Sequence, residues 1–196
     1  MMKVVLEYFY LGAIMKRFIL SAFAALGALL LFTSCSGEIL KPQPPDMDIP
    51  YKIGAEITFD DFEAKAELQR QSVGKWTIAF SEPYALSGLT LAFDGGEITA
   101  ELEGITAVVT ESESYTNLAS IILSALDNAA VGEGFDLVTT DEIIQLSGKT
   151  EYGDYTLKFD KASKTPVSLA IDGRKISVAF SDMEKTEKED VDAVLE

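Results

Sequence analysis

The chain has 196 residues, 47% of them hydrophobic, and this length predicts one domain with a buried core. Its 32 acidic residues outnumber 16 basic ones and give a net charge of -16, so the surface repels nucleic-acid phosphates, whose binding requires Lys and Arg. With no histidine and only one cysteine, the chain lacks the commonest general base, a cysteine pair and a multi-cysteine zinc site. We therefore expect no nucleic-acid partner, no metal and no cofactor.

Residues 15–34 have the pattern of a secretory signal peptide. Met15 is followed by Lys16 and Arg17, by an uncharged apolar run over 18–32, and then by small residues. A basic start, an apolar stretch of about 7–15 residues and a small-residue exit are typical of export signals, whereas a membrane-spanning helix needs about 20 apolar residues. Residues 1–14 do not fit this pattern, so we expect translation to begin at Met15 and residues 1–14 to be an upstream segment.

The end of this segment, Thr33-Ser34-Cys35, resembles the lipobox of bacterial lipoproteins, although Phe32 stands where that family usually has Leu. The resemblance implies that the thiol of Cys35 receives a diacylglyceryl group and that a peptidase cleaves between Ser34 and Cys35. Two acyl chains such as palmitate hold a protein firmly in a bilayer. The chain is then extracytoplasmic and membrane-anchored, on the cytoplasmic membrane or on an outer membrane where the host has one. The alternative is an uncleaved signal anchor with an incidental cysteine.

Residues 35–50 are predicted to form a tether between the lipidated cysteine and a folded domain. Four of the six prolines of the chain (Pro42, Pro44, Pro45 and Pro50) lie in this segment. Proline-rich segments are extended and semi-rigid and work as spacers.

Residues 51–183 show the period-two alternation of half-buried strands. Apolar residues alternate with polar ones at Ile53–Phe59, Phe62–Leu68, Trp76–Phe80, Leu89–Phe93, Ile98–Leu102, Ile105–Val109, Ile143–Lys149, Tyr155–Phe159, Val167–Ile171 and Ile176–Phe180. Asp94-Gly95-Gly96 predicts a hairpin turn, because glycine accepts the positive φ that such turns require. One segment has helical spacing instead, from Thr116 as an expected N-cap to the glycines near 132. The charged tail, 184–196, is expected to be a frayed helix or disordered.

The predicted fold is mainly β, in the α+β class. Sequential hairpins with one apolar face argue for a large curved antiparallel sheet that forms an incomplete barrel over the amphipathic helix, because an apolar sheet face must be covered. A β-sandwich is the alternative. The curled form leaves a cavity or groove beside the helix.

The domain resembles the LolA-like lipoprotein-carrier superfamily, which includes LolA, LolB and the LppX type. The similarity lies in KWTIAFSEP (75–83), LAFDGG (91–96), YTLKFD (155–160) and PVSLAI (166–171). It implies a concave apolar surface that binds a lipid or another hydrophobic ligand, without a catalytic residue. The side chains that we expect on this surface are Trp76, Ile78, Phe80, Leu91 and Phe93, and the alternative for each is ordinary core packing under the helix.

The sequence predicts that the protein is not an enzyme. Asp60-Asp61 and Asp141-Glu142 are adjacent carboxylates, but a glycosidase needs two carboxyl groups about 5–10 Å apart across a sugar, which adjacency does not establish. The leading interpretation is a membrane-anchored lipoprotein that binds a lipid or hydrophobic ligand. The alternative is a cell-envelope structural or protein-interaction lipoprotein with a closed, ligand-free core.

The expected start at Met15 can be tested in the native host. A frameshift placed between Met1 and Met15 should leave the amount of protein unchanged, measured by immunoblotting, because initiation would occur downstream of the change. Loss of the protein would show that translation begins at Met1.

Overall fold

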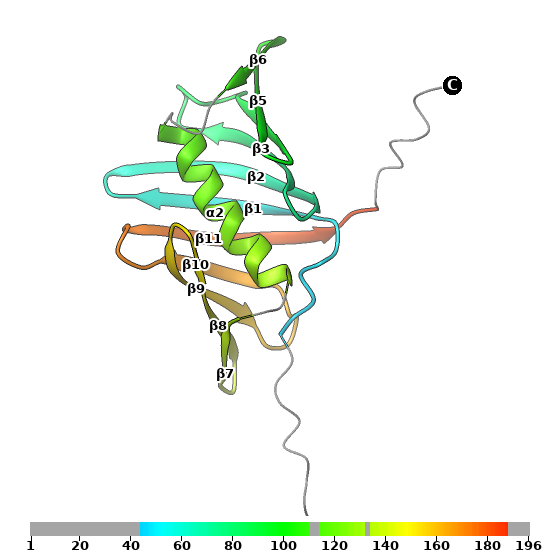
Figure 1. The fold of residues 1–196 in the computed structure, drawn as a ribbon, viewed down its shortest axis with the longest axis vertical. Coiled ribbons are helices and arrows are strands. Elements are labelled where there is room, and N and C mark those ends of the chain that lie inside the picture. Colours follow the sequence, from blue (N-terminus) through cyan, green and yellow to red (C-terminus); the bar gives the residue numbers. More distant parts are fainter. Residues whose placement is uncertain (1–43, 110–113, 132–133, 188–196) are drawn as a thin grey trace, which may run out of the picture. The chain divides into compact units, whose positions relative to one another are not determined.

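The computed structural model describes residues 44–109, 114–131 and 134–187, which form an antiparallel sheet of eleven strands with one helix across it (Figure 1). The strands of the first half are β1 (Tyr51–Phe59), β2 (Phe62–Ser72), β3 (Lys75–Glu82), β4 (Thr90–Asp94), β5 (Glu97–Leu102) and β6 (Ile105–Val109). The helix is α2 (Ser114–Val131). The second half contains β7 (Asp136–Thr139), β8 (Ile143–Thr150), β9 (Gly153–Asp160), β10 (Pro166–Ile171) and β11 (Ile176–Lys185).

The sheet consists of two meanders that start and finish at its centre. Its order is β6-β5-β4-β3-β2-β1-β11-β10-β9-β8-β7, so the chain moves outward from β1 to one edge at β6. It then crosses to the opposite edge by way of α2 and returns from β7 to β11. The last strand pairs with the first from Tyr51↔Lys185 to Phe59↔Ile176, which joins the two meanders into one sheet.

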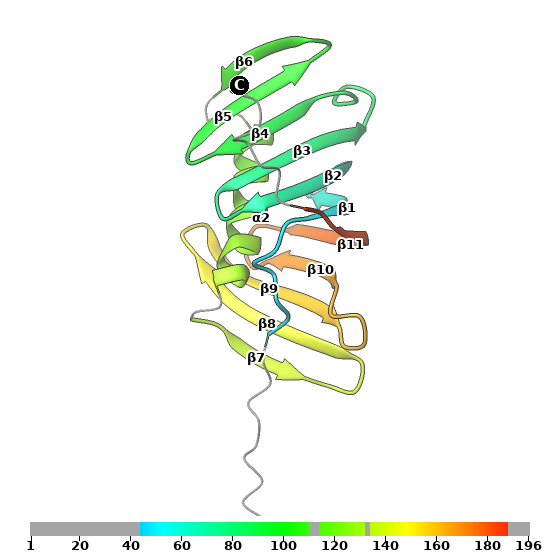
Figure 2. The same cartoon turned by 90° about the vertical axis from the view of Figure 1, so that its right-hand side faces the viewer.

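The predicted incomplete barrel over a helix is confirmed, and the β-sandwich alternative is wrong, because the described strands form one sheet. The edge strands β6 and β7 are not paired with each other, so the barrel is open. Adjacent residues of α2 bind to the two halves of the sheet: Asp127 accepts a hydrogen bond from Trp76 on β3, and Asn128 accepts one from Tyr155 on β9. One short stretch of helix contacts both halves because the sheet curls around it (Figure 2).

The helix runs diagonally across the sheet from the β3 side to β9 and packs most extensively against β8 (Figure 1). Eleven strands at a spacing of about 4.8 Å would extend about 48 Å if flat. A helix of 18 residues is only about 27 Å long. The helix is therefore shorter than the sheet is wide, and Leu102 and Ile105 at the β6 edge stay exposed.

The alternation predicted from the sequence sorts side chains between the two faces as expected. In β1, Tyr51, Ile53, Ala55 and Ile57 are buried, whereas the residues between them are half-buried or exposed. The corresponding positions of the other strands and the apolar residues of α2 complete one hydrophobic core. The core lies on the helix side of the sheet.

Three boundaries differ from the sequence prediction. Thr116 was expected to cap the helix, but α2 begins at Ser114, so Thr116 is a buried helical residue. The short edge strand β7 was not predicted, because DLVT is too brief to show a period. Glu184 and Lys185, expected in the charged tail, continue β11 because they pair with Lys52 and Tyr51; residues 188–196 lie outside the described part.

Gly148 on β8 is required by the packing of an aromatic ring. A Cβ atom built at this position would lie 2.5 Å from the hydroxyl oxygen of Tyr155 and 2.6 Å from its Cζ. The ring cannot easily move away, because it is buried and its hydroxyl donates a hydrogen bond of 2.7 Å to Asn128. The missing side chain at Gly148 thus allows β9 to reach the helix.

We expect Gly148→Ala to destabilise the domain by about 1–3 kcal/mol, the usual cost of inserting a methyl group into a closely packed site. Urea unfolding monitored by Trp76 fluorescence measures this change. The control is Lys149→Ala on the same strand, which alters an exposed side chain and should change stability by less than about 0.5 kcal/mol. Equal stability of the two variants would contradict the packing role of Gly148.

Candidate functional site

The five residues expected on the apolar surface lie together on the helix side of β3 and β4. Trp76 pairs across the strands with Phe93, and Ile78 pairs with Leu91. Phe93 is partly buried, whereas the other four side chains are buried members of the hydrophobic core. The structure thus brings the predicted residues onto one surface, where they pack as core side chains, and contact with a ligand stays a prediction.

The apolar surface continues from these residues to the edge of the sheet. Ile98 and Ala100 of β5 pair with Phe93 and Leu91 of β4, and therefore share their face. Leu102 and its partner Ile105 of β6 extend the same face. Burial decreases along this path: Ile98 is buried, Ala100 is half-buried and Leu102 is 42% exposed. The helix-side surface is thus open towards solvent at the β4–β6 end.

A buried charge cluster lies at the other end of the helix. We call Arg70, Asp127, Asp48, Trp76 and Tyr51 the Arg70 cluster. The guanidinium of Arg70 is 1% exposed and donates to Asp48 Oδ1 at 2.9 Å, to the backbone oxygen of Ile49 at 3.2 Å and to Asp127 Oδ1 at 3.4 Å. The cluster ties the segment before β1, strand β2 and helix α2 to one another.

Asp127 is the acceptor that links the helix to the sheet. Its Oδ1 accepts a hydrogen bond of 3.0 Å from Trp76 Nε1, and its Oδ2 accepts one of 2.8 Å from the backbone N–H of Gly74 in the β2–β3 turn. Arg70 lies over the indole ring, 5.9 Å from its centroid, within the range of a cation–π contact. Removal of Asp127 would leave a buried cation and two N–H groups without this acceptor.

Two buried tyrosines flank the helix and remain protonated. The ring of Tyr51 packs edge-on against Trp76 at 5.7 Å. Burial raises the pKa of Tyr51 far above its usual value, against the opposing effect of the Arg70 charge, and its hydroxyl has no hydrogen-bond partner among the described residues. Burial also raises the pKa of Tyr155 to about 12, so this hydroxyl stays a donor to Asn128 near neutral pH.

The Arg70 cluster was missed in the sequence, although a signal was present. Ala64, Ala66 and Leu68 occupy the inward positions of β2, and the same period of two places Arg70 next in the series. A charged residue at an inward position must find a partner, because an unpaired buried charge is costly. The periodicity could therefore have identified Arg70, but not Asp127, which lies 57 residues away.

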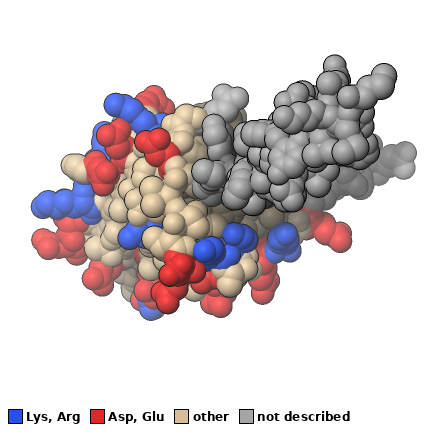
Figure 3. Space-filling view, turned by 90° about the horizontal axis from the view of Figure 1, so that it is seen from below, with Lys and Arg blue, Asp and Glu red and all other residues tan. Residues whose placement is uncertain are grey.

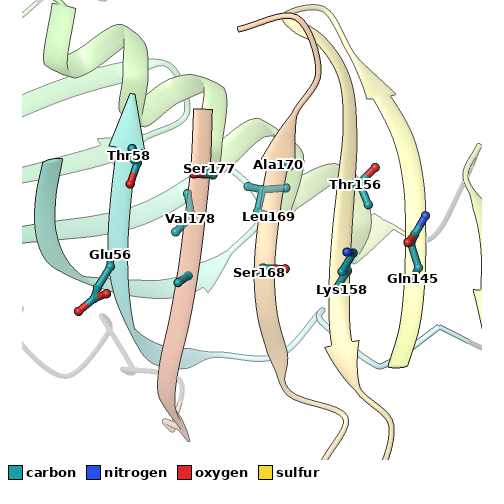
Figure 4. Close-up of a pocket in the computed structure, with 11 residues that line it drawn as sticks. Glu56, Thr58, Gln145, Thr156, Lys158, Ser168, Leu169, Ala170, Ser177 and Val178 are labelled. Carbon is teal, nitrogen blue, oxygen red and sulfur yellow. The ribbon is translucent and has the colours of Figure 1, made fainter. Parts of the chain in front are cut away.

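A polar depression, which we call the outer hollow, lies on the face of the sheet opposite the helix (Figure 4). It has a volume of about 580 Å³, is open to solvent and extends over β1, β11, β10, β9 and β8. Its floor is made of small or uncharged side chains with one acid and one base, from Glu56, Thr58, Gln145, Thr156, Lys158, Ser168, Ala170, Ser177 and Ala179. Leu169 and Val178 also line it, although their side chains belong to the core on the helix side. The hydroxyl and amide groups there can donate and accept hydrogen bonds, but the chain has no histidine to activate a serine.

The acidic pairs noted in the sequence lie exposed, outside the strands. Asp60 lies in the β1–β2 turn, where its carboxylate contacts Lys175 at 2.9 Å and raises the pKa of that lysine. Asp141 and Glu142 are exposed between β7 and β8. Within the described ranges, no group of three or more Asp, Glu, Cys or His residues is arranged to hold a metal ion.

The anchor residues Ser34 and Cys35 lie outside the described residues. The last part of the predicted tether is described, and it packs against the domain: Met47 is buried in the core and Asp48 binds Arg70. Only the residues before this point can therefore act as a free spacer. Among the residues that the structure covers, α2 is not apolar enough over its length to cross a bilayer.

Several solved structures resemble this chain in fold, each at low sequence identity. An uncharacterised conserved protein of Thermus thermophilus is 12% identical, with a TM-score of 0.44 over 72% of this chain and 82% of that one. A LolA superfamily protein of Nitrosomonas europaea is 10% identical, with a TM-score of 0.36 over 71% and 87%. LprF of Mycobacterium bovis is 12% identical, with a TM-score of 0.38 over 72% and 91%. No family model matches the chain, and no curated protein sequence matches it.

We expect Asp127→Ala to destabilise the domain by about 3–5 kcal/mol, because it leaves the Arg70 cation buried without its helix partner. Urea unfolding of residues 36–196 measures this loss. The control is Asp154→Ala, which removes an exposed ion pair with Lys149 and should cost less than about 1 kcal/mol. A similar small loss in both variants would show that the cluster does not hold the helix to the sheet.

Proposed function

We propose that this protein is a membrane-anchored extracytoplasmic lipoprotein whose half-barrel domain binds a lipid or another hydrophobic ligand without catalysis. The observation that carries the proposal is the apolar helix-side surface, which runs from the buried core at Trp76 and Leu91 to exposed Leu102 and Ile105. A buried apolar surface that opens gradually to solvent gives an apolar chain a path from water into the core. Each methylene that leaves water contributes about 0.8 kcal/mol.

The position of this surface follows from the mismatch between sheet and helix. Helix α2 packs against β8, and the Arg70 cluster holds its C-terminal half against β2 and β3. The entrance lies at the β4–β6 end, away from this cluster. A ligand could therefore enter between the helix and β5 without breaking the buried ion pair.

Membrane anchoring rests on the signal-peptide pattern and on Cys35. The described part of the domain has an acidic surface, which does not attract anionic lipid headgroups, so attachment requires the acyl chains. The N-terminal segment and the end of β11 lie together, with Thr186 donating a hydrogen bond to the oxygen of Pro50 at 3.1 Å.

The alternative, an envelope protein-interaction lipoprotein with a ligand-free core, is favoured by the dense packing of the predicted surface residues. Ile78 and Leu91 are at most 1% exposed. In that case the outer hollow and the strand edges are the working surfaces.

Ligand binding is tested by filling the apolar entrance. Ala100→Trp places a large side chain on the helix side of β5, whereas Thr99→Trp places the same side chain on the opposite face of the same strand. The protein, residues 36–196, is extracted with organic solvent for mass spectrometry and titrated with N-phenyl-1-naphthylamine. We expect wild type and Thr99→Trp to bind the dye and to release lipid, and Ala100→Trp to lose at least about 80% of both, because its ring occupies the apolar space. No lipid and no dye binding in the wild type would support the ligand-free alternative.

Anchoring is tested separately with Cys35→Ser in the full chain. Wild type should incorporate radiolabelled palmitate and sediment with membranes, and Cys35→Ser should lose the label completely, because the acyl acceptor is absent. Ser36→Ala is the matched control and should retain the label. A labelled Cys35→Ser variant, or an unlabelled wild type, would rule out the lipidation of residue 35.

A further inference from the structure

Strand β6 is an open edge of the sheet with apolar side chains on both faces. Its sequence, ITAVV, contains no charged residue. Ile105 on the helix side is 74% exposed and Val108 on the other side is 72% exposed. Proteins commonly protect such an edge with a charged residue, a proline or a covering segment, because its unpaired backbone groups attract other strands. In the described residues, β6 pairs only with β5.

The hairpin geometry identifies the backbone groups that are available. Glu103 and Gly104 both have positive φ, 51° and 80°, and form a two-residue turn that pairs Leu102 with Ile105. In such a hairpin the closing pair is hydrogen-bonded, and alternate residues point their N–H and C=O groups to the other side. Thr106 and Val108 therefore direct their backbone groups away from β5 to the open edge.

The charge at the β5–β6 end of the sheet indicates which kind of strand could bind to the β6 edge. The sequence has no Lys or Arg between Lys75 and Lys149. Glu97 and Glu101 are exposed on β5 and share the face that carries Val108. At the β7 end, by contrast, basic and acidic side chains are interspersed (Figure 3), and Lys161 donates to the backbone oxygen of Thr140. The acidic end would repel an identical acidic end of a second copy and attract a basic strand.

We propose that the edge of β6 binds an extended polypeptide segment in which apolar residues alternate with Lys or Arg. The segment adds a twelfth strand by bonding to the backbone of Thr106 and Val108, which is the strand-addition mode of peptide recognition. Its basic side chains lie on the face of Thr106 and Val108, one strand beyond Glu97 and Glu101 of β5, and its apolar side chains continue the surface of Ile105. The backbone bonds and the charges are independent of a ligand under the helix.

The test uses the full chain in phosphatidylcholine nanodiscs, titrated with a fluorescein-labelled peptide that alternates Lys and Val. We expect saturable binding that weakens as salt is raised, because exposed charges are screened. A peptide that alternates Glu and Val should bind at least about tenfold more weakly, owing to like-charge repulsion. A Lys-Val peptide with a central proline tests the need for an unbroken strand and should also bind at least about tenfold more weakly.

Two single variants block the edge of β6, and two double variants remove acidic charges. Thr106→Pro removes an outward N–H and no bond to β5, so we expect binding to weaken at least about tenfold with the fold retained in near-UV circular dichroism. Val108→Lys adds a charge of the same sign as the peptide and serves as a second edge variant. Glu97→Gln with Glu101→Gln should weaken binding about fivefold, whereas the control Asp141→Asn with Glu151→Gln, which removes two exposed acids near the other edge, should leave it unchanged.

The proposal is overturned if Thr106→Pro and Val108→Lys bind the Lys-Val peptide as tightly as wild type, or if the Glu-Val peptide binds equally well. It is also overturned if the wild type shows no saturable binding. A wild-type dimer that Thr106→Pro converts to monomer would instead assign the edge to a second copy of the chain. Dye binding by the same variants keeps the two proposals separate, because the edge variants should retain it.

Discussion

The buried contact between Arg70 and Asp127 is the constraint on which the arrangement of this domain depends. Eleven strands form one apolar face that is too wide for one helix, and apolar packing alone would not define where the helix lies. Because a buried guanidinium must be paired, Asp127 is placed against β2 and β3, and Asn128 is thereby directed towards Tyr155 on β9. The C-terminal half of the helix is thus held against β2 and β3, and the apolar surface remains open further along the same half of the sheet, at β5 and β6.

The ion pair that stabilises the domain and the surface proposed to bind a ligand therefore lie on different strands. At the end held by the Arg70 cluster, Trp76 and Tyr51 are buried and charged groups are satisfied by one another. At the β4–β6 end, the apolar surface reaches Leu102 and Ile105 without being covered. A hydrophobic ligand or a partner strand can gain contacts there without disrupting the ion pair that maintains the fold.

The same topology explains why both edges are exposed. The chain enters at β1 and leaves after β11, and these two strands pair with each other at the centre of the sheet. The two edge strands, β6 and β7, therefore come from the middle of the chain, and α2 connects them across the face of the sheet. Both edge strands lie in the stretch without Lys or Arg between Lys75 and Lys149, but Lys161 donates to the backbone oxygen of Thr140 directly after β7. Glu97 and Glu101 lie on the strand next to β6, and this difference favours β6 as a surface for basic partners.

The sequence by itself determined the class of the fold, because alternation of period two assigns each strand residue to a face and Asp94-Gly95-Gly96 requires a turn. It also placed Trp76, Ile78, Phe80, Leu91 and Phe93 on one surface. Sequence periodicity contains no information on pairs distant in the chain, so the contact of Arg70 with Asp127 and the space that Gly148 leaves for Tyr155 were decided by tertiary structure. The outer hollow likewise arises only when five strands are aligned in register, because each contributes only a few ordinary polar or small residues.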